Sequence, residues 1–83
     1  MDVAQSYIVE FYRKEPGDIG IDDLILLPDQ DLELIATKAL LGYSDNLTIA
    51  AVQRPHHARV LSGDRFKCLM TLMIAGPRIV EKV

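Results

Sequence analysis

The clearest pattern in the chain is a helical stripe between residues 29 and 44. Apolar residues recur there at spacings of three and four, the period of one face of an α-helix. Asp29 is the predicted N-cap, because a carboxylate accepts hydrogen bonds from the unpaired N–H groups of a first turn. Gly42 is expected to end the helix, since glycine readily adopts the left-handed conformation that follows many helices. The stripe consists of Leu32, Ile35, Ala36, Ala39, Leu40 and Tyr43.

A second amphipathic helix is predicted from residue 64 to residue 75. Ser62 or Asp64 would cap its start. Gly76 and Pro77 would end it, because proline cannot continue the hydrogen-bond ladder of a helix. Its apolar stripe consists of Phe66, Leu69, Met70, Met73 and Ile74.

The remaining apolar segments favour β-strands. Residues 7–12 are rich in β-branched and aromatic side chains, and their alternation would put Tyr7, Val9 and Phe11 on one face. A helix capped by Asp2 is the alternative for this segment. Further strands are predicted at residues 47–52, 58–61 and 78–82, with an irregular edge strand at residues 19–21 or 24–27.

In chain order these elements are a strand, an irregular segment, a helix, two strands, a helix and a strand. This is the split β-α-β order of a ferredoxin-like sandwich. We therefore expect one compact α+β domain over residues 1–83, a small two-layer sandwich with two helices on one face of an antiparallel sheet. A small all-α cluster of four or five helices is the alternative, and it requires the strand predictions to fail together.

Composition and cysteine usage narrow the class of protein. Hydrophobic residues make up 49% of the chain and charged residues 25%, which is typical of a folded globular domain. Cys68 has no partner for an internal disulfide, and its apolar neighbours indicate a buried thiol in a reducing compartment. The first residues resemble no secretory signal, and the apolar stretch 68–77 is about half of what a bilayer span requires. We expect a cytoplasmic protein that does not enter membranes.

The charges are sorted along the chain. Residues 1–45 carry ten acids and three bases, whereas residues 46–83 carry two acids and six bases. Surface charge does little to specify a fold and much to select the partners that a surface attracts. The asymmetry therefore predicts binding to a partner, and it also allows a homodimer in which the acidic segment of one subunit meets the basic segment of another.

The acidic half contains a mixed acidic and apolar segment. Charge on such a surface would speed the encounter with a basic protein, while the apolar side chains would supply affinity. Our principal prediction is a small non-enzymatic interaction protein that regulates or inhibits a macromolecular partner. The predicted partner-binding residues are Asp18, Ile21, Asp22, Asp23 and Leu24.

The basic half contains a cluster of functional groups on a predicted turn, made of Arg54, His56, His57 and Arg59. Guanidinium and imidazole groups together can present several donors to a phosphate or a carboxylate. An anion- or nucleic-acid-binding module that uses this loop is therefore the alternative function. Two features oppose it: the acidic half would repel phosphates, and residues 58–61 include no aromatic ring on which a base could stack.

We recognise no catalytic or metal-binding constellation in the sequence. The adjacent His56 and His57 lack the spacing that puts two imidazoles on one helix face, and no nearby acid or cysteine completes a ligand set. Cys68 lies within an apolar segment, and its neighbour Lys67 would not face it on a helix, so nothing is expected to activate the thiol. We therefore expect no enzymatic activity, no cofactor and no bound metal.

Overall fold

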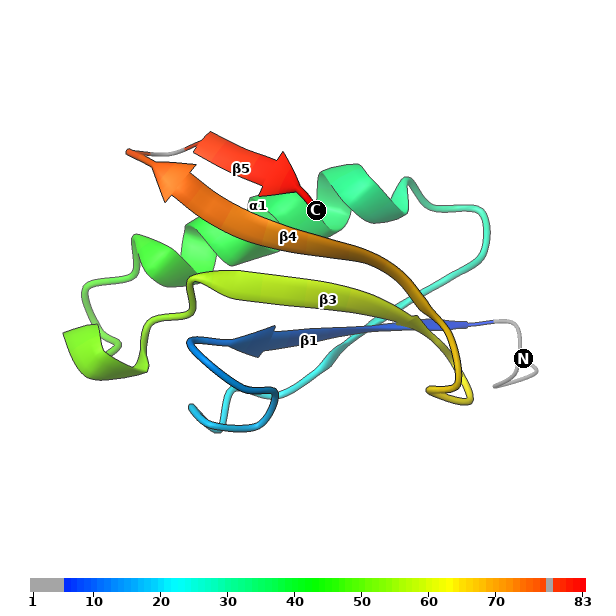
Figure 1. Ribbon diagram of the computed structural model, residues 1–83, viewed down its shortest axis with the longest axis horizontal. Coiled ribbons are helices and arrows are strands. Elements are labelled where there is room, and N and C mark those ends of the chain that lie inside the picture. Colours follow the sequence, from blue (N-terminus) through cyan, green and yellow to red (C-terminus); the bar gives the residue numbers. More distant parts are fainter. Residues whose placement is uncertain (1–5, 78) are drawn as a thin grey trace.

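The computed structural model describes residues 6–77 and 79–83. Their five strands form one antiparallel sheet in the order β2-β1-β3-β4-β5, and α1 packs on one face of it (Figure 1). The predicted α+β class is confirmed, but the ferredoxin-like arrangement with two helices is wrong. The elements are β1 (Tyr7–Tyr12), β2 (Leu24–Leu26), α1 (Leu32–Ser44), the 3-10 turn η2 (Ala51–Gln53), β3 (His57–Ser62), β4 (Cys68–Gly76) and β5 (Ile79–Lys82).

The predicted helix over residues 64–75 is wrong, because most of this segment forms the strand β4. Its helical stripe left out Leu72, which is only 1% exposed, and included Phe66, which is 89% exposed. Alternate residues of a strand share a face, so Met70, Leu72 and Ile74 turn together toward the core. Nearly every position from 68 to 74 is apolar, and such a run satisfies the helical and the strand period equally well.

The predicted helix caps Ser62 and Asp64 instead form the turn between β3 and β4. The Ser62 hydroxyl donates to the Asp64 carboxylate at 2.6 Å, and the same carboxylate accepts the N–H of Phe66 at 3.0 Å. These two hydrogen bonds lower the pKa of Asp64. Arg65 completes the turn with a φ of 65°, a left-handed conformation that is uncommon for a residue with a side chain.

The first predicted helix is confirmed as α1, with shifted ends. Asp31 caps it in place of Asp29, and its carboxylate accepts the N–H of Leu34 at 3.1 Å. Gly42 lies inside the last turn, and the helix continues to Ser44. All six residues of the predicted stripe pack in or against the core. No helix in the described ranges has both the length and the apolar character that crossing a membrane requires.

The strand β1 confirms the prediction for residues 7–12, with Tyr7, Val9 and Phe11 on the face that meets α1. Asp2, which the helical alternative used as a cap, lies outside the described residues. The edge strand predicted at residues 24–27 is confirmed as β2, which pairs with β1. The last strand is confirmed as β5, although Arg78 lies outside the described residues.

The strand predicted at residues 47–52 is wrong. Residues 46–54 form turns and the short helix η2, and two arginines, Arg13 and Arg54, donate hydrogen bonds to main-chain carbonyls of this segment. Those carbonyls therefore have side-chain donors in place of a neighbouring strand. The strand predicted at residues 58–61 is present as β3, which pairs with β1 and β4.

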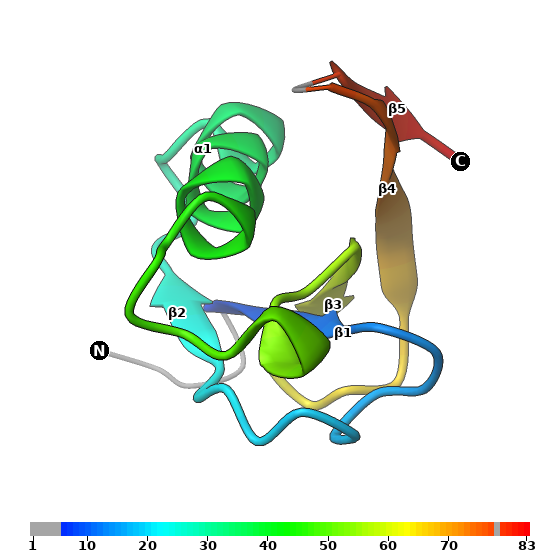
Figure 2. The same cartoon turned by 90° about the vertical axis from the view of Figure 1, so that its left-hand side faces the viewer.

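The core lies between α1 and the concave face of the sheet. Figure 2 shows the sheet curving from β2 to β5, with α1 held inside the curve. The ring of Phe11 meets the ring of Tyr43 edge to face, with centroids 4.9 Å apart, and so joins β1 to the last turn of α1. The fully enclosed cluster consists of Val9, Phe11, Leu26, Ala36, Leu40, Ala58, Val60 and Leu72.

The assignment of residues 68–76 to a strand can be tested by comparing two truncations. We expect Leu72→Ala to lower the free energy of unfolding by about 2–5 kcal/mol, because it removes a fully buried side chain. Phe66→Ala should change it by less than about 0.5 kcal/mol, because that ring is exposed. Urea unfolding measures both variants. A larger loss for Phe66→Ala than for Leu72→Ala would contradict the strand.

Candidate functional site

The residues of the predicted anion-binding loop do not converge on one point. Arg54 precedes β3, and its Nε donates to the carbonyls of Asn46 and Ile49 at 3.1 and 2.9 Å. His56 is exposed. Partial burial lowers its pKa, and the positive charge of Arg13 lowers it further. The Nε of Arg54 is therefore already engaged by main-chain carbonyls, and whether Arg54 or His56 contacts an anion stays a prediction.

His57 and Arg59 lie on the open face of the sheet, the face opposite α1. Their neighbours along β3, Ala58 and Val60, are buried in the core, so alternation turns His57 and Arg59 outward. The His57 ring stacks on the Tyr12 ring, with centroids 5.1 Å apart and planes 10° from parallel. Partial burial raises the pKa of the Tyr12 hydroxyl.

Alternating charges cross the open face beside this stack. Glu10 on β1 pairs with both Arg59 and Arg65, and Arg65 also pairs with Asp23 at 2.8 Å. The hydrogen bond to Asp23 and the charge of Glu10 raise the pKa of Arg65. Both guanidiniums thus already have carboxylate partners, so the open face presents a largely compensated surface to an approaching phosphate.

The predicted acidic and apolar segment is only partly available to a partner. The carboxylate of Asp18 accepts the main-chain N–H groups of three preceding residues at 2.8–3.1 Å and thereby closes the turn after β1. Asp23 pairs with Arg65, while Ile21 and Leu24 pack against the core. Asp22 is exposed. Binding of a partner to this segment stays a prediction.

Cys68 is exposed, so the prediction of a buried thiol is wrong. It begins β4, pairing across from Leu61, and its Sγ lies 3.6 Å from the carbonyl oxygen of Met70 and 3.8 Å from Oγ1 of Thr71. Within the described ranges, His, Cys, Asp and Glu side chains form no group of three that could hold a metal ion.

The strand β5 stands at one edge of the sheet. The N–H of Val83 donates to the carbonyl of Thr71 on β4 at 2.7 Å. Hydrogen-bonded and non-hydrogen-bonded pairs alternate along an antiparallel ladder, so the main chain of Glu81 also faces β4. The N–H and C=O groups of Val80 and Lys82 therefore point away from β4. No strand pairs with this outer side in the part of the chain that the structure describes.

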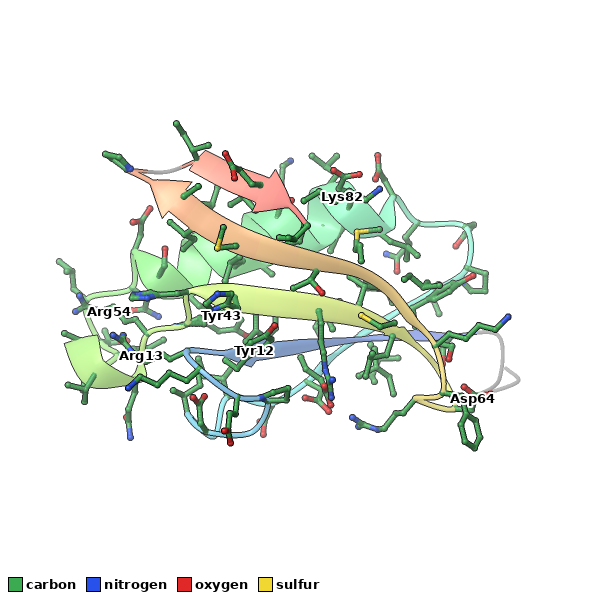
Figure 3. The ribbon with its side chains drawn as sticks, in the orientation of Figure 1. Tyr12, Arg13, Tyr43, Arg54, Asp64 and Lys82 are labelled. Carbon is green, nitrogen blue, oxygen red and sulfur yellow. The ribbon has the colours of Figure 1, made fainter. Side chains whose placement is uncertain are left out.

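A groove of about 370 Å³ lies between this edge and α1. Lys82 Nζ is 3.9 Å from the Glu33 carboxylate, so the start of α1 lies beside the end of β5. Figure 1 shows the two elements running in opposite directions, and Figure 3 shows Lys82 beside the first turns of α1. Leu34 is 49% exposed within the groove. The groove is lined by Asp31, Glu33, Leu34, Thr37 and Val80.

Sequence reasoning missed this edge and groove. Leu34 was an available signal, because it is apolar and lies outside the stripe of α1. The groove also depends on β5 lying beside α1. That placement could not be derived while residues 64–75 were taken as a helix, because β5 is held in the sheet by pairing with β4.

The pairing of β5 predicts a pattern of amide hydrogen exchange. In the free protein, the N–H groups of Val80 and Lys82 should exchange with solvent faster than the N–H of Glu81, because only Glu81 faces β4. Exchange measured residue by residue with NMR tests this pattern. Slow exchange at Val80 and Lys82 together would mean that the outer edge is already covered, and the site would then not be open.

A second prediction concerns the turn that Asp18 closes. Hydrogen bonds from the main-chain N–H groups of Glu15, Arg13 and Lys14 lower the pKa of Asp18 below its ordinary value of 3.8. The stabilisation is therefore present above that value and is lost as the pH falls through the lower, folded-state pKa. Asp18→Asn should be less stable than the wild type at pH 7 in urea unfolding, and the difference should shrink below about pH 4. Asp22→Asn is the control, and a difference independent of pH would contradict this role.

Comparison with known proteins assigns no family to the chain. No protein-family model, no curated protein and no solved structure matches it. A function must therefore be inferred from the chain's own geometry, and the open edge of β5 beside an acidic and apolar groove is the arrangement best suited to binding.

Proposed function

We propose that this chain is a non-enzymatic interaction domain that binds an extended segment of a partner protein as an added strand on β5. The observation that carries the proposal is the outward-pointing main chain of Val80 and Lys82 beside the groove of α1. In strand addition, main-chain hydrogen bonds provide affinity, and pockets for alternate side chains provide specificity. The edge and the groove supply these two components.

The side chains around the edge support this mode of binding. Ile79 and Val83 are 57% and 73% exposed, so apolar surface borders β5 at both ends. Natural sheets often protect an open edge with a charge that repels an added strand. The charge of Lys82 is directed toward Glu33 on the helix side, where it leaves the outer main chain accessible.

The groove has the mixed acidic and apolar character that the sequence analysis predicted for a partner-binding surface, although at other residues. It combines the carboxylates of Asp31 and Glu33 with the apolar side chains of Leu34 and Val80. The segment around Asp18 and Asp23 has similar residues, but there Asp18 accepts three main-chain N–H groups and Asp23 pairs with Arg65 at 2.8 Å. In the groove Asp31 accepts the N–H of Leu34, and Glu33 lies 3.9 Å from Lys82, so these carboxylates are less fully engaged. An acidic and apolar surface for a partner is therefore better supported at the groove.

The anion-binding alternative receives less support from the contacts of the arginines. Arg59 and Arg65 are paired with Glu10, and the Arg13 guanidinium donates to the carbonyls of Ala51 and Arg54 at 2.8 and 2.9 Å. Binding a phosphate with these groups would require breaking contacts that join elements of the fold. Regulation or inhibition of a partner would follow from occlusion, because a segment paired with β5 is withheld from other proteins.

Selection from a displayed library of random linear peptides tests the proposal. We expect the immobilised protein to enrich peptides with alternating apolar residues, because alternate side chains of an added strand face the groove. Lys82→Pro should weaken their binding by about tenfold or more, since it removes an outward N–H and blocks the edge. Lys82→Ala is the matched control, because it loses the same charge and keeps the N–H.

The test also requires evidence that Lys82→Pro is folded and that a bound peptide covers the outer edge of β5. Circular dichroism must show that Lys82→Pro is folded, which we expect because the outward N–H makes no bond to β4. Amide exchange at Val80 and Lys82 should slow when an enriched peptide binds the wild type. Peptides that bind Lys82→Pro as tightly as Lys82→Ala, or a selection that enriches nothing, would refute strand addition.

A further inference from the structure

We infer that the segment bound at β5 carries an apolar residue and a lysine or arginine two positions apart, both facing α1. This inference rests on the proposed function and specifies the partner. It follows from the order of chemical groups along the groove, which is apolar beside Val80 and acidic beside Lys82.

The apolar position follows from the register of an added strand. Val80 packs against the core, so its side chain lies on the helix face of the sheet. A residue placed directly opposite Val80 on an added strand would share that face. It would lie over Leu34 and Thr37, where an apolar side chain would cover the exposed half of Leu34.

The basic residue of the bound segment lies two residues from the apolar one, opposite Lys82. Glu33 and Asp31 line the groove at this end, and Lys82 approaches Glu33 only loosely, at 3.9 Å. Lys82 is paired with Glu33, so a cation from the partner would balance the remaining negative charge of Asp31 at this end of the groove. Lys38, about one turn along α1 from Leu34, is positive and so disfavours a basic residue at the other end.

The same strand disfavours a second copy of this chain as the occupant. In the antiparallel pairing of two β5 strands that is centred on Glu81, Val80 of each copy lies opposite Lys82 of the other. Glu81 then lies opposite Glu81, and like charges directly opposite each other destabilise a strand pair. A partner with a neutral or basic residue at that position avoids the repulsion.

Two synthetic peptides that differ at one position test the inference. Both are extended sequences rich in valine and threonine with one leucine, and two residues from the leucine one carries lysine and the other glutamate. At low salt we expect the lysine peptide to bind the wild type about three- to tenfold more tightly in fluorescence anisotropy. The preference should fade near 0.5 M salt, where screening shortens the range of these charges to roughly 4 Å.

Charge and apolar variants identify the groove as the origin of the preference. Asp31→Asn with Glu33→Gln should remove the preference for lysine, and asparagine retains the helix cap. Glu15→Gln with Asp22→Asn removes the same charge elsewhere and should leave the preference intact. Leu34→Asn should weaken both peptides, whereas Leu47→Asn, at a leucine that is 85% exposed and outside the groove, should weaken neither.

The outcomes separate this inference from the proposed function. Equal binding of the two peptides, with both sensitive to Lys82→Pro, would overturn the charge rule and leave strand addition standing. Failure of every peptide, including those selected from the library, would overturn both. A doubled mass in light scattering that Lys82→Pro abolishes would assign the edge to a second copy and overturn the inferred partner.

Discussion

One helix has to cover a sheet of five strands, and most other features of the described fold follow from this mismatch. An α-helix with its side chains is about 10 Å across, and neighbouring strands are about 4.8 Å apart, so a helix covers roughly two strands. The sheet responds by curving around α1, which brings Leu26 at one side and Leu72 at the other into a single core. The last strand lies at the rim of this curve, where α1 approaches it without closing the space between them.

The same mismatch accounts for the charged side chains on part of the open face, where Ile8 and Leu61 are nevertheless buried. With no described element packed as a layer against that face, its inner strands can carry charges in contact with solvent. Glu10 and Arg59 occupy opposed positions on β1 and β3, and Arg65 extends the pairing to Asp23 beyond the sheet. These ion pairs hold the β3–β4 turn against the first half of the chain. Surface pairs of this kind contribute little energy individually, so their main effect is to fix geometry.

The elements predicted correctly from the sequence are those whose apolar residues fit either the helical period or the strand period, but not both. The stripe of α1 has polar residues between its apolar ones, and residues 7–12 alternate, so both elements were found. The run from Cys68 to Ile74 is apolar at nearly every position, and a local pattern cannot decide its period. Residues 47–52 looked like a strand because they form a short apolar run. Their main-chain carbonyls instead accept hydrogen bonds from the nearby Arg54 and from the distant Arg13, and no local apolar pattern reveals these contacts. The candidate site could not be predicted for the same reason, because the groove between α1 and β5 exists only once β5 has paired with β4.

The wide separation of paired segments along the chain has a consequence for how the protein folds. The guanidinium of Arg59 reaches Glu10 across 49 residues, and that of Arg65 reaches it across 55. During synthesis β1 therefore emerges long before β3, and only the three residues of β2 can pair with it in the meantime. Forming contacts between residues so far apart in the sequence costs conformational entropy, because a long loop must be closed. These contacts stabilise the fold only when their favourable energy exceeds that cost. Until β3 is available, β1 therefore has only β2 as a strand partner, and the five-stranded sheet can form only when the C-terminal half of the chain is present.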